Sequence, residues 1–249
     1  MLFSSIPFLY YFLPGVLITY FLVPQKLKNA VLLLFSLVFY GWGEPVYVFL
    51  MVATILLNYV CGWWIDSRRS AGKSAKGVLV AGVAANLLIL GFFKYAGFLV
   101  ESLQAVLPFL AGLRVPEITL PIGISFYVFQ SMSYIIDVYR DDAPVQKDPI
   151  AFGTYVTLFP QLIAGPIVRY SDVALQLKTR RENIADFASG IRLFVVGLGK
   201  KVLLANQMGA LWELLQVQPG TLAAWVGIAA YSLQLYFDFS GYSDMARGL

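Results

Sequence analysis

The chain has 249 residues, of which 59% are hydrophobic and only 13% are charged, with a formal net charge of +4. A soluble domain of this size carries about 25% charged residues, because its surface must be wetted. The composition therefore excludes an ordinary soluble globule and indicates an integral membrane protein. Because the positive charge lies in loops, it indicates topology and a lipid-bilayer environment, and we expect no nucleic-acid partner.

Charged residues are absent from six long windows of the sequence. Crossing about 30 Å of hydrocarbon takes roughly 20 helical residues, and several windows have that length. Strand-type alternation is absent, so the windows predict helices rather than a β-barrel. The windows are Met1–Gln25, Val46–Ile65, Gly77–Phe93, Ile118–Ile136, Pro149–Val168 and Leu214–Phe237.

The first predicted span is Pro7–Val23. We expect it to stay uncleaved, because no Lys or Arg lies between Met1 and this span, as the basic start of a signal peptide would require. The next apolar stretch, Asn29–Ile65, is too long for one crossing, and Gly41–Pro45 interrupts it. These features predict a helical hairpin. Basic residues follow both segments and should be cytoplasmic, which places the N-terminus on the periplasmic side.

Further along the chain, Val78–Phe93 is predicted to cross outward, and Lys94–Glu117 to form an interfacial helix and a loop containing Pro108 and Pro116. Ile118–Ile136 should then return inward. Ser189–Asn206 is a weak span, tilted or interfacial, and Leu222–Phe237 is a strong one. The sequence thus predicts an all-α, multi-helix membrane bundle with about seven crossings, a re-entrant segment and interfacial helices.

Pro149–Val168 is long enough to span, yet basic residues lie after it. A crossing would place one basic flank outside, and Pro160, Gly165 and Pro166 interrupt a regular helix, so the sequence favours a re-entrant segment, with a true crossing as the alternative. Irregular backbone at membrane depth needs protein or a wet cavity around it. The candidate site residues here are Pro160, Gln161, Gly165, Pro166 and Arg169. Arg169 could hold a phosphate or carboxylate, or could simply reach toward lipid headgroups.

A second polar cluster ends the last apolar stretch. Gln234 and Asp238 share a helical face, as do Asp238 and Tyr242 if the helix continues. A carboxylate at the end of a membrane span is costly unless it is paired or wet. The cluster therefore predicts either a substrate-cavity wall or an ordinary interface with a cap of a following helix. Its candidate residues are Gln234, Asp238, Ser240, Tyr242 and Asp244.

Other polar residues have simpler interpretations. Ser125, Tyr127, Gln130 and nearby hydroxyl residues favour close helix packing, with channel lining as the alternative. Lys200 and Lys201 are interpreted as lipid-headgroup contacts. The sequence contains no histidine and one cysteine, so no histidine general base or thiolate metal cage is available, and no metal site or catalytic residue is predicted in this chain.

Several motifs resemble the membrane-bound O-acyltransferase family. They are Pro121–Gln130 leading to Tyr134–Arg140, Phe159–Ile167 with Arg169, Asp238–Ala246, the opening Met1–Ile6, and Tyr40–Pro45. The likeness covers the whole chain and is strongest to the bacterial members that acetylate alginate. It implies a funnel-shaped, multi-pass protein of the bacterial inner membrane that transfers acetyl groups for O-acetylation of a surface polysaccharide.

The resemblance also implies acetyl-CoA as acetyl donor, no covalently bound cofactor, and partners among periplasmic acetyltransferases and the polysaccharide machinery. The family's catalytic histidine is expected after the Asp238–Asp244 cluster. Because the chain ends at Leu249, we expect one membrane domain over 1–249 that is the N-terminal half of the enzyme, incomplete at its C-terminus and inactive alone.

Three other functions remain open on the sequence. The chain could serve an acyltransferase for another glycan, or for D-alanylation of teichoic acid. It could be a transporter or channel, which would need intramembrane charges along a pathway or a repeat. It could also be a non-catalytic membrane scaffold.

Overall fold

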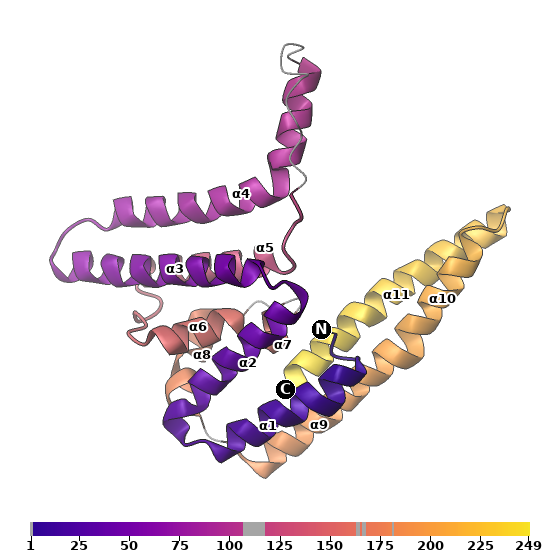
Figure 1. The fold of residues 1–249 in the computed structure, drawn as a ribbon, viewed down its shortest axis with the longest axis horizontal. Coiled ribbons are helices and arrows are strands. Elements are labelled where there is room, and N and C mark those ends of the chain that lie inside the picture. Colours follow the sequence, from indigo (N-terminus) through magenta and orange to yellow (C-terminus); the bar gives the residue numbers. More distant parts are fainter. Residues whose placement is uncertain (1, 107–117, 163–164, 166–167, 181) are drawn as a thin grey trace. The chain divides into compact units, whose positions relative to one another are not determined.

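The structure is a computed structural model that describes residues 2–106, 118–162, 165, 168–180 and 182–249. The described residues form helices and no strand, which confirms the predicted all-helical class. The helices are η1 (Phe8–Phe12), α1 (Leu13–Leu22), η2 (Gln25–Leu27), α2 (Lys28–Gly43), α3 (Tyr47–Ser70), α4 (Lys76–Val106), α5 (Ile124–Arg140), α6 (Pro149–Thr157), α7 (Phe159–Leu162), α8 (Tyr170–Lys178), α9 (Ile184–Gly199), η4 (Lys200–Ala205), α10 (Asn206–Leu215) and α11 (Thr221–Gly248) (Figure 1).

Two helices of the described residues, α3 and α4, are long and apolar enough to cross a membrane. The Phe8–Leu22 run is a shorter apolar helix. The break predicted at Gly41–Pro45 is confirmed, because α2 ends at Gly43 and α3 begins at Tyr47. The count of about seven crossings and the periplasmic N-terminus stay predictions.

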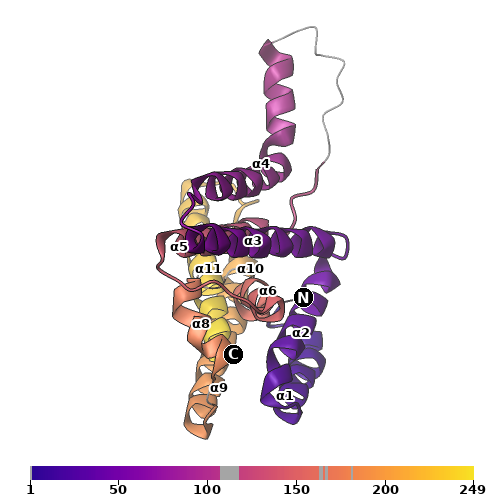
Figure 2. The ribbon, with the colours of Figure 1, turned by 90° about the vertical axis from the view of Figure 1, so that its left-hand side faces the viewer.

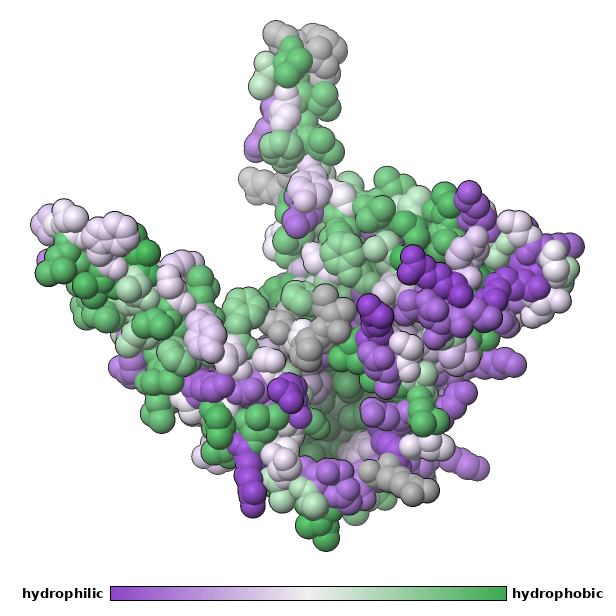
Figure 3. Space-filling view, turned by 180° about the vertical axis from the view of Figure 1, so that it is seen from behind, coloured by the Kyte–Doolittle hydropathy of each residue, from purple (hydrophilic) through white to green (hydrophobic). Residues whose placement is uncertain are grey.

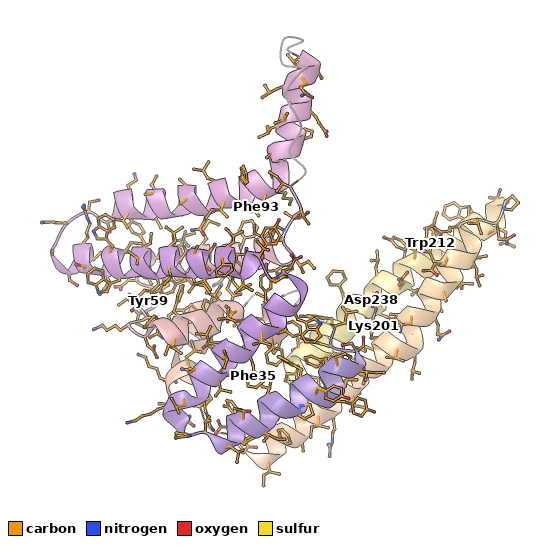
Figure 4. The ribbon with its side chains drawn as sticks, viewed as in Figure 1. Phe35, Tyr59, Phe93, Lys201, Trp212 and Asp238 are labelled. Atoms are coloured by element: carbon orange, nitrogen blue, oxygen red, sulfur yellow. The ribbon has the colours of Figure 1, made fainter. Side chains whose placement is uncertain are left out.

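The helix α4 is longer than the predicted span, since it runs without interruption to Val106. Both ribbon views show that it bends, so that only its first part runs beside α3 (Figures 1 and 2). The bend lies near Phe93, where the predicted crossing ends (Figure 4). The expected loop with Pro108 and Pro116 falls outside the described residues.

The segment predicted to be re-entrant is not one continuous helix. The helix α6 ends at Thr157 after nine residues, which at about 1.5 Å per residue is far too short to span hydrocarbon. Asp148 caps its first turn by accepting a hydrogen bond from the Ile150 N–H at 2.9 Å. A continuous crossing helix over Pro149–Val168 is therefore wrong, whereas re-entry from one side stays a prediction.

The described chain forms two compact units, each built from separate segments of sequence. Unit 1 contains Met1–Leu32, Phe159–Pro166 and Arg180–Leu249, and unit 2 contains Leu33–Leu158 and Ile167–Thr179. The chain passes from one unit to the other several times. The prediction of a single domain stays a prediction.

In unit 1, α9, η4 and α10 follow one another and pack along α11 (Figure 1). Glycines spaced by seven residues bring α9 and α11 into backbone contact. A Cβ atom at Gly190 would lie 2.5 Å from the Gly248 carbonyl oxygen, and one at Gly197 would lie 2.5 Å from that of Gly241. Small residues permit such close approach of apolar helices, and these pairs set the register of α9 on α11.

The start of α9 is tied to α1 and α2 by a polar cluster around Glu182. The Glu182 carboxylate forms an ion pair with the Lys28 ammonium at 2.7 Å and accepts a hydrogen bond from the Tyr20 hydroxyl at 2.7 Å. The hydrogen bond from Lys28 is the largest cause that lowers the pKa of Glu182 from its ordinary 4.5 to about 2. This link joins sequence segments about 150 residues apart within unit 1.

In unit 2, α3, α4 and α5 pack together, and α6 and α8 complete the core. Asn58 of α3 and Asn86 of α4 exchange two amide hydrogen bonds of 2.9 and 2.8 Å, and both side chains are fully buried. Gly62 leaves space for the Tyr134 ring, whose atoms would lie 2.6 Å from a Cβ there. Tyr127 and Gln130 are buried and Gln130 donates to the Tyr155 carbonyl oxygen, so this helix face serves packing.

Candidate functional site

The two consecutive lysines of η4 form ion pairs with the polar cluster of α11. The Lys200 ammonium lies 2.6 Å from an Asp244 carboxylate oxygen and 2.9 Å from the Ser240 hydroxyl oxygen. Lys201 forms an ion pair with Asp238. The interpretation of both lysines as lipid-headgroup contacts is wrong, because charges in an apolar setting are far less costly when paired.

The local helix geometry explains how adjacent lysines reach different carboxylates. The helix α11 continues through the polar cluster to Gly248, so its Asp238 and Asp244 are six residues apart on one continuous helix. Lys200 and Lys201 begin a π-helical turn. Such turns are rare in proteins, and those that occur lie frequently at functional sites. The alternative in which Ser or Asp caps a following helix is wrong, because Ser240 and Asp244 lie inside α11.

A cavity of about 250 Å³ lies beside the Lys201–Asp238 pair in unit 1. Figure 4 shows these two side chains next to each other. The remaining lining is mostly apolar and comes from the N-terminal segment and from α11. The lining residues are Leu2, Phe3, Ser4, Lys201, Asp238, Phe239, Tyr242 and Met245.

Aromatic packing fixes the N-terminal wall of this cavity. The Phe3 ring stacks on the Tyr242 ring at 4.7 Å between centroids, with an interplanar angle of 8°. Phe3 also meets Phe159 edge-on at 6.3 Å. Such ring pairs add about 1 kcal/mol each beyond the area that they bury. The first residues of the chain are therefore part of the site.

Tyr242 connects the two clusters that the sequence singled out separately. Its hydroxyl donates a hydrogen bond to the Pro160 carbonyl oxygen at 3.1 Å. Gln161 follows on the same short helix, and Gly165 packs so tightly that a Cβ there would lie 2.3 Å from the Gln161 Cα. Glycine is required at that close approach. Pro166 lies outside the described residues.

Other candidate residues lie apart from the cavity lining. Gln234 lies one turn before Asp238 on α11, and its buried side-chain oxygen has no hydrogen-bond partner among the described residues. Arg169 belongs to unit 2, where it is exposed and precedes α8. Within unit 1 the structure therefore brings together Pro160, Asp238 and Tyr242, with Ser240 and Asp244 joined through Lys200.

Sequence reasoning missed three contributors, namely Lys200, Lys201 and Phe3. A signal for the lysines existed, because two cations and two carboxylates sit in otherwise apolar helices and have few partners available. Pairing them would have placed the helix containing Lys200 beside the one containing Asp238. Nothing in the sequence marks Phe3 as different from the other N-terminal aromatic residues.

The site can hold a small apolar group next to a charge pair. Among the described residues no three His, Cys, Asp or Glu side chains are placed to bind a metal ion. The predicted lack of a metal and of a catalytic residue stays a prediction. Because the chain has no histidine, these residues supply walls, a charge pair and hydrogen bonds rather than a histidine base.

No protein-family model matches this sequence. It is 44% identical to a protein of Azotobacter vinelandii named probable alginate O-acetylase, over 100% of this chain and 51% of that protein. It is 43% identical to the probable alginate O-acetylase of Pseudomonas aeruginosa, over 100% of this chain and 49% of that protein. It is 32% identical to a peptidoglycan O-acetyltransferase of Helicobacter pylori, over 100% of this chain and 53% of that protein.

The chain resembles about half of a polysaccharide O-acetylase. The likeness expected from the motifs is thereby confirmed, and it extends over the whole chain. The chain spans about half the length of these curated relatives. The names of these relatives describe enzymes that O-acetylate alginate or peptidoglycan.

Proposed function

We propose that this chain is part of an integral membrane O-acetyltransferase that acetylates a surface polysaccharide, and that the polysaccharide is alginate. The observation that carries the proposal is identity of 42–44% over the whole chain to proteins named probable alginate O-acetylase. Acetyl groups pass from cytoplasmic acetyl-CoA across the inner membrane to periplasmic acetyltransferase partners. The N-terminus lies in the periplasm.

In this proposal the cavity of unit 1 belongs to the path of the acetyl group. Its apolar walls contact the methyl end of the acetyl group, and the Lys201–Asp238 pair orients the polar end. In this proposal a histidine general base, which these 249 residues lack, belongs to the other half of the enzyme.

A chimera tests the proposal. In it, this chain replaces the matching half of the Azotobacter vinelandii protein, and the host is an alginate-producing bacterium that lacks its own O-acetylase. We expect the chimera to restore acetyl esters on alginate, measured by proton NMR of the purified polymer. The chain expressed alone at the same membrane level should give none. Alginate that stays unacetylated although the chimera is present in the membrane would contradict the proposal.

The second candidate function is O-acetylation of peptidoglycan, which the 32% identity to the Helicobacter pylori enzyme favours. A chimera with the matching half of that enzyme distinguishes the two. If the half supplied by the relative determines which polysaccharide is acetylated, only the first chimera, which contains half of the Azotobacter vinelandii protein, should acetylate alginate. Peptidoglycan acetylation by the first chimera would assign acceptor choice to this chain and favour the second candidate.

A further inference from the structure

The turn between α3 and α4 carries a group of cations without acidic partners. Arg68, Lys73 and Lys76 are exposed, and none of them has an ion pair among the described residues. They lie within nine residues at the meeting point of the two helices that are long and apolar enough to cross a membrane. We call these three residues the basic tip. Figure 3 shows hydrophilic side chains gathered at that end of the molecule, on its right-hand side.

The fourth cation of this turn, Arg69, has a structural role. Its guanidinium donates to the Val138 carbonyl oxygen at 2.8 Å and forms an ion pair with Asp141 at 3.0 Å. It thus adds a second hydrogen bond to a carbonyl that also accepts from the Asp141 N–H at 3.3 Å, at the C-terminal end of α5, where cations are favoured. This anchor holds the turn against α5 and leaves the basic tip available.

Two tryptophans precede the basic tip on α3. Trp63 and Trp64 expose 56% and 49% of their surface. The Arg68 guanidinium carbon lies 5.7 Å from the centroid of the Trp64 ring. Tryptophan is enriched at headgroup depth in membrane proteins. With the tryptophans at that depth, Arg68 one turn further along lies at the phosphate level.

Carboxylates near the turn do not cancel its charge. Asp141 is engaged by Arg69. Within residues 66–76 the acidic residue is Asp66, which is only partly exposed. The three cations of the basic tip against this one carboxylate leave a positive balance at the turn.

We propose that the basic tip binds the phosphate groups of anionic phospholipids, with Trp63 and Trp64 inserted beside the lipid glycerol backbone. Each Lys or Arg at an anionic membrane surface raises affinity about fivefold, and salt weakens the effect. Three cations together therefore predict on the order of a hundredfold preference for anionic over zwitterionic lipid at low salt. The proposal is independent of the acetyltransferase activity.

Tryptophan quenching by brominated lipid tests the proposal. The full chain in detergent micelles carries Trp42→Phe, Trp212→Phe and Trp225→Phe, so that Trp63 and Trp64 alone report. We expect brominated phosphatidylglycerol to quench at far lower mole fraction than brominated phosphatidylcholine. The variant Arg68→Gln/Lys73→Gln/Lys76→Gln should lose this preference.

The matched control is Lys94→Gln/Lys178→Gln/Arg192→Gln. It removes the same charge from three other exposed residues without ion pairs among the described residues. The control should keep the preference for phosphatidylglycerol, and far-ultraviolet circular dichroism should show equal helicity in both triple variants. The proposal would be overturned if the two lipids quenched equally in the protein whose basic tip is intact. It would also be overturned if both triple variants lost the preference to the same extent.

Discussion

The two units of the molecule place polar groups among apolar helices in opposite ways. Unit 1 uses charges, in the Lys200–Asp244 and Lys201–Asp238 pairs, and these side chains keep 17–31% of their surface exposed beside a cavity. Unit 2 uses uncharged amides, and the Asn58–Asn86 pair is fully buried. The difference follows from solvation, since a paired amide tolerates full burial and a charge pair does so only at several kcal/mol.

The units also differ in how their helices approach. In unit 1, α9 and α11 touch through glycine backbone at Gly197 and Gly241. In unit 2, Gly62 makes room for the Tyr134 ring, as Gly227 does for the Trp212 ring in unit 1. Backbone contact leaves no side chain to adjust, so we expect the α9–α11 contact to be the least tolerant of added volume.

Gly197→Leu should have the largest effect. A Cβ at Gly197 already lies 2.5 Å from the Gly241 carbonyl oxygen and 2.7 Å from the Met245 nitrogen, so α9 must move off α11. We expect a loss of about 3 kcal/mol or more, measured by thermal unfolding in detergent. Gly199→Ala is the control, since nothing lies within 4 Å of its Cβ. Equal destabilisation by both would refute glycine contact as the feature that joins these helices.

Asn58→Leu should cost about 2 kcal/mol, because it leaves the buried Asn86 amide without its partner. The double variant Asn58→Leu/Asn86→Leu should recover most of that loss, since neither side chain then requires a hydrogen bond. Chemical unfolding of the three proteins measures the coupling. If the double variant is the sum of the two single losses, the amides do not act as a pair.

Asp238→Asn should cost about 1–2 kcal/mol, less than a fully buried pair, because water reaches both partners. Lys201→Met alone should cost a similar amount. A double-mutant cycle on the two residues should show coupling, whereas Asp238→Asn and Lys94→Gln should simply add. No coupling between Lys201 and Asp238 would contradict the ion pair.

Glu182 should give the smallest effect, since its side chain is about one-third exposed and solvent screens it. Its pKa is lowered from 4.5 to about 2, so its carboxylate stabilises the fold at pH above about 4.5. That contribution is lost as pH falls from about 4.5 toward 2. The unfolding temperature of Glu182→Gln should therefore differ from that of the original protein at pH 7 and converge with it below pH 2.

Much of the helical layout was predictable because charge placement and helix breakers are local signals. The windows Pro7–Val23 and Val78–Phe93, and the break at Gly41–Pro45, needed only composition and glycine or proline chemistry. The structure shows that Pro149–Val168 is broken at Thr157–Phe159, which the length of the window alone could not reveal.

The candidate site was only half predictable, for a physical reason. Asp238, Tyr242 and Pro160 stand out as polar or helix-breaking residues in apolar segments. Their partners Lys200, Lys201 and Phe3 are set by tertiary packing over about 40 to more than 200 residues of sequence. From the sequence, two lysines in a weak span are equally compatible with lipid headgroups and with carboxylates as partners. The glycine contacts decide between these partners, because they place the helix of the lysines against α11.

The central claim is tested most directly by substituting Asp238 or Lys201 in the chimera and measuring the acetyl ester content of the alginate that the cells then make. If the unit 1 cavity serves acetyl transfer, Lys201→Met should lower the ester content strongly, and the charge-removing control Lys178→Gln should leave it unchanged at equal membrane levels of protein. A fully active Lys201→Met chimera would contradict a role for the cavity in acetyl transfer.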